Sequence, residues 1–220
     1  MEKLTNNIAG EIAAELNLDN DNKEVIAYGL FAIINIFLSI ILIIIFGMIF
    51  HVIIEALIVC FTGSLLRKYS GGIHATSPGR CTTIGTIICI GQAILFLFLI
   101  GPVITPSLLL FFGIGIFTLA YYFIYKLVPV DSPAKPIRTK EKKIRMKKGA
   151  IFVLSGYMVI IIINIFIYIS LGDERFMVYS LCIYGGVAWQ IFTLTTLGHN
   201  TMNKIDVFLT EVLKIKKGGK

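Results

Sequence analysis

The sequence carries little charge for its length. Only 15% of its 220 residues are charged, whereas a soluble domain carries about 25% because its surface faces water. Hydrophobic residues make up 56% of the chain, and the mean hydropathy is +0.85. Lipid must therefore cover much of the exterior. This excludes most soluble folds and indicates an integral membrane protein.

Cysteines and recognisable cofactor motifs are also scarce. Four cysteines, three of them inside apolar runs, exclude a disulfide scaffold. No CxxC pair is present, and His74, Cys81 and His199 supply three zinc ligands at most, so we expect no metal and no cofactor. The sequence contains no GxxxxGK[ST] loop for coupling ATP hydrolysis. Residues 1–24 lack the basic and then apolar order of a signal peptide.

The apolar runs predict an all-α fold with about six membrane crossings. A spanning helix needs roughly 17–25 apolar residues, and these runs lack the alternation of a barrel strand. Val25–Leu66 would reach about 63 Å as one helix, twice the bilayer, so it must turn back near Gly47–His51. The expected crossings are Val25–Phe46, a short Val52–Leu66, Thr82–Ile100, Val103–Leu127, Ala150–Leu171 and Phe176–Leu197.

The basic residues predict how the chain is oriented. With six crossings, 19 of the 20 Lys and Arg residues fall on one side, and Arg175 is the exception. The net charge of +7 would suggest nucleic-acid binding in a soluble protein, but here it follows the tendency of cytoplasmic loops to be basic. We therefore expect no nucleic-acid partner. Both termini, the loop 67–81, the basic loop 126–149 and the tail 200–220 are expected on the cytoplasmic side of the cell membrane.

The first 24 residues predict an amphipathic helix. Leu4, Ile8, Ile12 and Leu16 recur every four residues, as on one face of a helix. We expect this helix to lie at the cytoplasmic interface, with docking of a partner as the alternative. The chain as a whole, residues 1–220, is interpreted as a single membrane domain.

The loop 67–81 contains the cysteine best suited to chemistry. Cys81 lies at the end of a polar loop and at the start of a helix. A helix N-terminus and the neighbouring Arg80 both favour a thiolate, which is the nucleophilic form of cysteine.

His74 lies seven residues before this cysteine, and the turn residues Ser77-Pro78-Gly79 can fold the loop back. Its imidazole could then take the thiol proton and return a proton to a leaving amine. Gly71-Gly72 allow the backbone to approach a substrate closely or to offer amide donors. On spacing alone, a solvated loop histidine without a catalytic role is the alternative.

Two motifs in this sequence resemble a known family. Arg67, Gly71-Gly72, His74-Ala75 and Cys81, between two apolar segments, look like the active-site signature of the accessory gene regulator protein B family. The members of that family are membrane-embedded cysteine endopeptidases of Gram-positive quorum-sensing systems. The later stretch Val128–Ile137 (VPVDSPAKPI) is similar to the family's proline-rich cytoplasmic loop. The resemblance covers essentially the whole chain.

The resemblance implies that Cys81 is the nucleophile, that His74 is its base, and that Arg67, Gly71 and Gly72 support the site. It also implies a small (AgrD-like) precursor peptide as substrate, with an amphipathic leader, a central Cys or Ser and an acidic C-terminal tail. Cleavage before the tail would form an acyl-enzyme thioester, and the central side chain would then close a thiolactone or lactone ring. A homodimer is a further implication.

Two other classes of function remain open at this stage. A small peptide transporter or exporter would need polar residues through several crossings, and the sequence offers Glu55 and scattered amides. A membrane scaffold for a sensor protein would not need His74 or Cys81. Asp131 and His199 are weaker candidates for orienting His74, because a turn residue and an interfacial histidine need no catalytic role.

Overall fold

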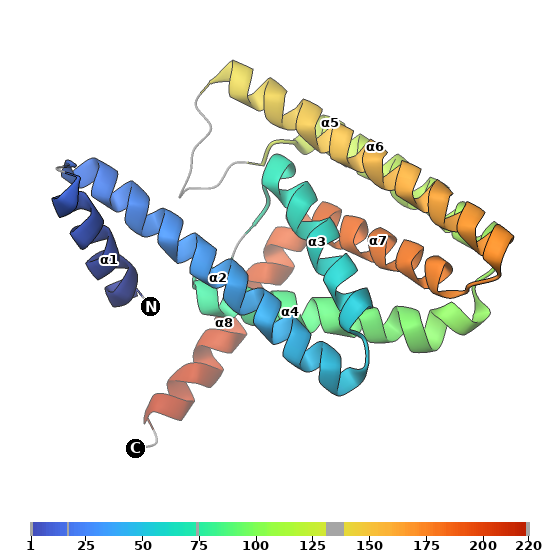
Figure 1. Ribbon diagram of the computed structural model, residues 1–220, viewed down its shortest axis with the longest axis horizontal. Coiled ribbons are helices and arrows are strands. Elements are labelled where there is room, and N and C mark those ends of the chain that lie inside the picture. Colours follow the sequence, from blue (N-terminus) through green and yellow to red (C-terminus); the bar gives the residue numbers. More distant parts are fainter. Residues whose placement is uncertain (1, 17, 74, 131–138, 219–220) are drawn as a thin grey trace. The chain divides into compact units, whose positions relative to one another are not determined.

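The computed structural model describes residues 2–16, 18–73, 75–130 and 139–218, so His74 and Asp131 lie outside the described residues. The described chain is helical (Figure 1). It contains one isolated β-bridge, between Gly71 and Val130. It forms two compact units, residues 1–42 and 43–220. Its α-helices are α1 (Glu2–Glu15), α2 (Asn20–Phe50), α3 (Ile53–Ser70), α4 (Pro78–Ile94), α5 (Pro106–Leu127), α6 (Lys140–Leu171), α7 (Arg175–Phe192) and α8 (Thr196–Gly218).

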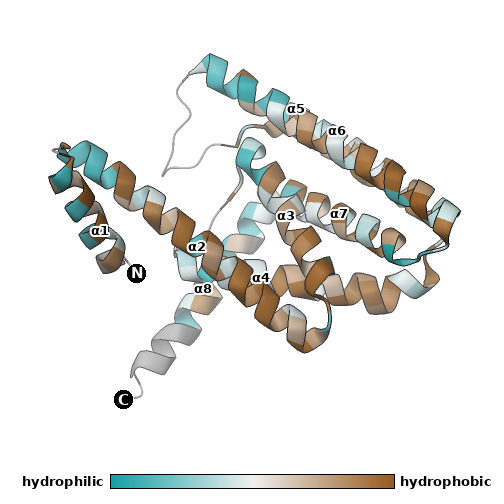
Figure 2. Cartoon of the chain, viewed as in Figure 1, coloured by the Kyte–Doolittle hydropathy of each residue, from teal (hydrophilic) through white to brown (hydrophobic). Residues whose placement is uncertain are grey.

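The all-α, polytopic membrane fold is confirmed. Among the described residues, four helical stretches are long and apolar enough to span a bilayer, namely α2, α4 with its continuation to Val103, α5 and α6 (Figure 2). A fifth is possible only if α7 and α8 are counted together across a bend of 89°. By length and composition, the described helices thus support four or five crossings, fewer than the six that the sequence predicted. The α3 segment falls short because it is 18 residues long and includes Glu55, Arg67 and Lys68.

Several predicted boundaries were wrong. The segment 1–24 is not one helix, because α1 ends at Glu15 and the Asp19 side chain accepts a hydrogen bond from the Asn22 amide at 2.9 Å at the start of α2. The crossing expected to run to Leu197 ends at Phe192. The tail 200–220 is largely part of α8.

The two basic loops are shorter than expected, because helices extend into both. The α3 helix continues to Ser70 and α4 begins at Pro78, which reduces the loop 67–81 to residues 71–77. In the loop 126–149, α6 begins at Lys140, and its hydrophilic first turns precede a long apolar stretch (Figure 2).

The turn between α2 and α3 falls where the sequence predicted it. A Cβ added to Gly47 would lie 2.9 Å from the Ile53 Cα, so a larger residue would push the two helix ends apart. His51 lies in this turn with φ of 56°, outside α3. It therefore does not share a helical face with Glu55, which is buried in the first turn of α3.

The α7 helix lies at the centre of the second unit and packs against α3, α5 and α6. Its glycines allow close contact, since a Cβ on Gly186 would lie 2.7 Å from Thr62 Cβ on α3. Small residues of this kind are what lets helices in a membrane approach each other closely. The Tyr184 hydroxyl on α7 donates a hydrogen bond to the Leu109 carbonyl at 3.2 Å, which leaves a buried polar group satisfied.

Packing against Tyr184 predicts a difference between two glycines of α5. A Cβ on Gly113 would lie 2.2 Å from Tyr184 Oη, whereas nothing lies within 4 Å of one on Gly115. We expect Gly113→Ala to lower the free energy of unfolding by about 1–3 kcal/mol, since overpacking forces neighbours to move. Gly115→Ala should leave it nearly unchanged. Unfolding of the detergent-solubilised protein, followed by circular dichroism, measures both, and equal values would contradict this packing.

Candidate active site

The first half of the loop between α3 and α4 is held by the C-terminal end of α7. The buried side-chain amide of Gln190 donates hydrogen bonds to Ser70 Oγ at 2.8 Å and to the Gly71 carbonyl at 2.7 Å. Gly72 has φ of +130°, and a Cβ there would lie 2.9 Å from Thr193 Oγ1. A glycine is therefore required by both the backbone conformation and the space. The start of the loop is therefore fixed against the end of α7 by the Gln190 hydrogen bonds and by the packing of Gly72 against Thr193.

The proline-rich segment also contacts this part of the loop. The Val130 amide donates a hydrogen bond to the Ser70 carbonyl at 2.9 Å, and Gly71 pairs with Val130 in the isolated β-bridge. Gly71 has φ of +73°, and a Cβ there would lie 2.1 Å from the Val130 carbonyl oxygen. The two motifs that resemble the family signature, far apart in sequence, are thus adjacent in space.

Arg67 extends from the last turn of α3 toward the middle of the loop. Its guanidinium donates a hydrogen bond to the Ile73 carbonyl, which directly precedes His74. Burial lowers the pKa of the Arg67 guanidinium, and the charge of the nearby Cys81 acts in the opposite direction. Its Nε atom is buried and has no hydrogen-bond partner among the described residues. Arg67 therefore links the loop backbone to the surroundings of the thiol.

Cys81 lies in the first turn of α4, as the sequence predicted. Its amide donates to the Ser77 carbonyl at 3.0 Å, and Pro78 begins the helix, where its missing N–H leaves no bond unmade. The four cysteines are thiols. Cys89 and Cys182 are buried inside helices, whereas Cys81 is half-buried at the end of the polar loop.

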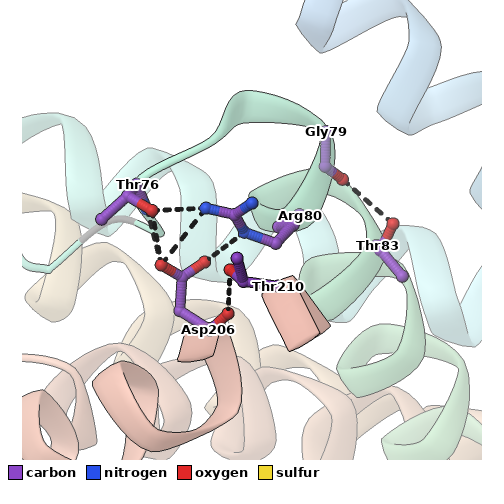
Figure 3. A network of polar contacts seen from close by, with 6 residues as sticks. All are labelled: Thr76, Gly79, Arg80, Thr83, Asp206 and Thr210. Carbon is purple, nitrogen blue, oxygen red and sulfur yellow. Dashed lines mark hydrogen bonds and ion pairs between the residues drawn. The ribbon is translucent and has the colours of Figure 1, made fainter. Parts of the chain in front are cut away.

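Asp206 on α8 holds the second half of the loop, and sequence reasoning missed it. Its carboxylate accepts hydrogen bonds from Thr76 and from the Arg80 side chain (Figure 3). The Arg80 guanidinium, together with the Thr76 donors, holds the pKa of this carboxyl below its usual value. The charge of Arg80, which we expected to favour a Cys81 thiolate, is thus paired with the Asp206 carboxylate. The sequence gave no signal of this contact, because Asp206 is one of two acids in a largely basic tail.

Of the two histidines considered for the site, the structure describes His199 but not His74. His74 lies outside the described residues, but its neighbours Ile73 and Thr76 are both anchored by hydrogen bonds. His199 is on α8, and its Nε2 atom is buried without a hydrogen-bond partner among the described residues. Among all described residues, no group of three His, Cys, Asp or Glu side chains is placed so that it could hold a metal ion.

The bridge to Val130 predicts a difference between two glycines near Cys81. Gly71→Ala would meet both a left-handed backbone and the Val130 carbonyl, a strain of about 1–3 kcal/mol. Gly79 has open space around its Cα, so Gly79→Ala is the matched control. We expect faster amide hydrogen exchange over residues 71–77 in Gly71→Ala and unchanged exchange in Gly79→Ala. Unchanged exchange in both variants would contradict the role of the bridge.

Comparison with known proteins identifies the family. A family model described as Accessory gene regulator B matches residues 5–194. An AgrB-like protein of Clostridium perfringens strain SM101 is 42% identical over 215 residues, which are 97% of this chain and 100% of the relative. AgrB-like protein 2 of C. perfringens strain 13 matches with the same identity and coverage. No solved structure matches the chain. Because the family model covers most of the chain and these relatives span nearly all of it, the protein belongs to the accessory gene regulator B family.

Proposed function

We propose that this protein is a membrane cysteine endopeptidase that cleaves and cyclises a small precursor of a quorum-sensing peptide. Membership of the accessory gene regulator B family, which takes part in processing such peptides, supports the proposal. In this role Cys81 is the nucleophile and His74 is the base. The substrate is a short peptide with an amphipathic leader, a central Cys or Ser and an acidic tail.

One observation carries the proposal. Cys81 is half-buried in the first turn of α4, at the end of a loop that is anchored on both halves by the Gln190 amide and the Asp206 carboxylate. The part-buried Arg67 guanidinium acts on it electrostatically. The first N–H groups of a helix are unpaired within it and point toward its N-terminal end. In α4 these are the Gly79 and Arg80 amides, because Pro78 has no N–H and the Cys81 amide donates to the Ser77 carbonyl. They suit an oxyanion that forms on a carbonyl attacked by the Cys81 sulfur.

The reaction has two steps. The Cys81 sulfur attacks the carbonyl carbon of the peptide bond before the acidic tail, and His74 takes the thiol proton and passes a proton to the leaving amine. The released tail leaves a thioester on Cys81. The central thiol or hydroxyl of the precursor then attacks this thioester, closes the ring and returns a proton to Cys81. An intramolecular nucleophile can outcompete water because its effective concentration is high.

Arg67, Gly71 and Gly72 act by shaping the loop. The Arg67 guanidinium faces the Ile73 carbonyl, so we assign it to holding the backbone beside His74. The two glycines allow the loop to lie against Val130 and Thr193. His74 and Cys81 belong to one short segment of the sequence, so we infer that they act on the same side of the membrane, which we take to be the cytoplasmic side.

Co-expression with a precursor peptide of this composition tests the proposal. Cys81→Ala and His74→Ala should each reduce cyclic product by at least about 100-fold, because each removes a group that acts in the bond-breaking step. Mass spectrometry of the product and immunoblotting of the precursor measure the loss. Cys60→Ala, which changes a cysteine inside α3, is the matched control and should process normally.

The outcomes separate the classes of function. Equal processing by wild type and both variants would exclude the peptidase in favour of a transporter or scaffold. Loss in Cys81→Ala with full activity in His74→Ala would show that another group is the base.

A further inference from the structure

We propose that Asp206 is a positioning residue for catalysis, which fixes the loop between His74 and Cys81 through Thr76 and Arg80. This role rests on the proposed function of Cys81. It extends the active site to α8, which begins at Thr196 and therefore lies beyond the residues 5–194 matched by the family model.

The contacts of Asp206 use both carboxylate oxygens. Oδ1 accepts a hydrogen bond from Arg80 Nε at 2.6 Å, and Oδ2 accepts from Thr76 Oγ1 at 2.6 Å and from the Thr76 amide at 3.2 Å (Figure 3). The Arg80 guanidinium also donates to Thr76 Oγ1, so the three residues form a closed network. The single Asp206 side chain thereby binds the Thr76 amide, the Thr76 hydroxyl and the Arg80 guanidinium.

Burial distinguishes this network from an ordinary surface ion pair. Asp206 is 7% exposed, and a carboxylate removed from water needs charged or polar partners. In the other described ion pair, the side chains of Asp173 and Arg175 are 24% and 72% exposed, compared with 9% and 18% for Asp206 and Arg80. Exposed pairs of that kind contribute little to structure. The Asp173 pair therefore offers a matched control of similar chemistry.

The chain between α7 and α8 determines where Asp206 lies. A Cβ on Gly198 would lie 1.9 Å from the Phe192 carbonyl oxygen, and the Gly198 amide donates to Thr195 Oγ1 at 3.1 Å. This corner turns the chain by 89°. As a result, the same segment contacts the first half of the loop through Gln190 and Thr193, and the second half through Asp206.

The consequence concerns the position of the reacting groups. His74 lies between the anchored Ile73 and Thr76, and Cys81 directly follows Arg80. A displacement of about 1 Å between reacting groups can reduce a rate roughly 100-fold. Without Asp206, the loop would retain its attachment to α7 but lose its attachment to α8. The precursor would still bind through its leader, so the turnover number would fall while KM changed little.

The test uses the full-length protein in nanodiscs with a synthetic precursor peptide that has an amphipathic leader, a central Cys and an acidic tail. We expect Asp206→Asn to lower kcat roughly 10- to 100-fold, with KM within about threefold of wild type. Asp173→Asn should match wild type. If Asp206 acts through Arg80, the double variant Asp206→Asn with Arg80→Gln should be no less active than the less active of the two single variants. Hydrogen exchange over residues 71–77 should be faster in Asp206→Asn.

Two results would overturn the inference: unchanged kcat in Asp206→Asn, whether or not KM changes, or additive losses in the double variant. If Asp206→Asn does not fold, as judged by its thermal unfolding, Thr76→Val removes one hydroxyl of the network and should lower kcat in the same direction. Unchanged kcat in Thr76→Val would then overturn it. Equal processing by wild type and Cys81→Ala is a different failure, because it rejects the proposed function itself. Faster loop exchange in Asp206→Asn would still support the structural half of the inference in that case, and unchanged exchange would overturn it.

Discussion

The hydrogen bonds from the Gln190 amide to Ser70 and Gly71 are the interaction on which the site depends. Gln190 is 1% exposed, so its amide would be unsatisfied in the helix bundle without these partners. Leaving such a group unpaired costs about 1–3 kcal/mol of folding free energy. This cost favours structures in which the start of the loop stays bonded to Gln190 on α7. Since α7 is itself packed among α3, α5 and α6, the loop is fixed relative to the core of the second unit.

Glycines make this arrangement possible in two different ways. At Gly186 the missing side chain allows α7 to approach α3 closely, which is a matter of space alone. At Gly71 and Gly72 the backbone also has positive φ, so conformation and space act together. The first kind sets the distance between helices, and the second kind sets the path of the chain between them. Both are needed to bring Val130 and Thr193 onto one loop.

The sequence predicted those features that depend on local composition. Apolar runs gave the helical membrane fold, because hydrophobic length is a property of the segment itself. The change from a polar loop to an apolar run correctly placed Cys81 at the start of a helix, whereas Pro78 and Gly79, which were predicted to be turn residues, already belong to the first turn of α4. The break after Phe192 was missed because it depends on hydroxyl and backbone hydrogen bonds of Thr193 and Thr195 within a run that remains apolar on average.

Features that depend on contacts between distant residues could not be predicted. The Thr76 and Asp206 side chains meet across 130 residues of chain, and nothing in the spacing of either residue connects them. The partial burial of Arg67 was also not predictable, because a basic residue beside a membrane segment is expected at the lipid surface. The position of α3 among its neighbours, rather than its composition, shields the Arg67 Nε atom from water.

The length of α6 has a mechanical consequence. Its 32 residues rise about 48 Å, well beyond the thickness of a hydrocarbon layer, and the surplus lies at the lysine-rich beginning. The α6 helix cannot move further into the membrane without bringing the charged lysine side chains at its start into the hydrocarbon core. The lysines therefore limit how deeply α6 can insert into the bilayer, so that a thinner bilayer is accommodated by tilting of the helix rather than by its inward movement.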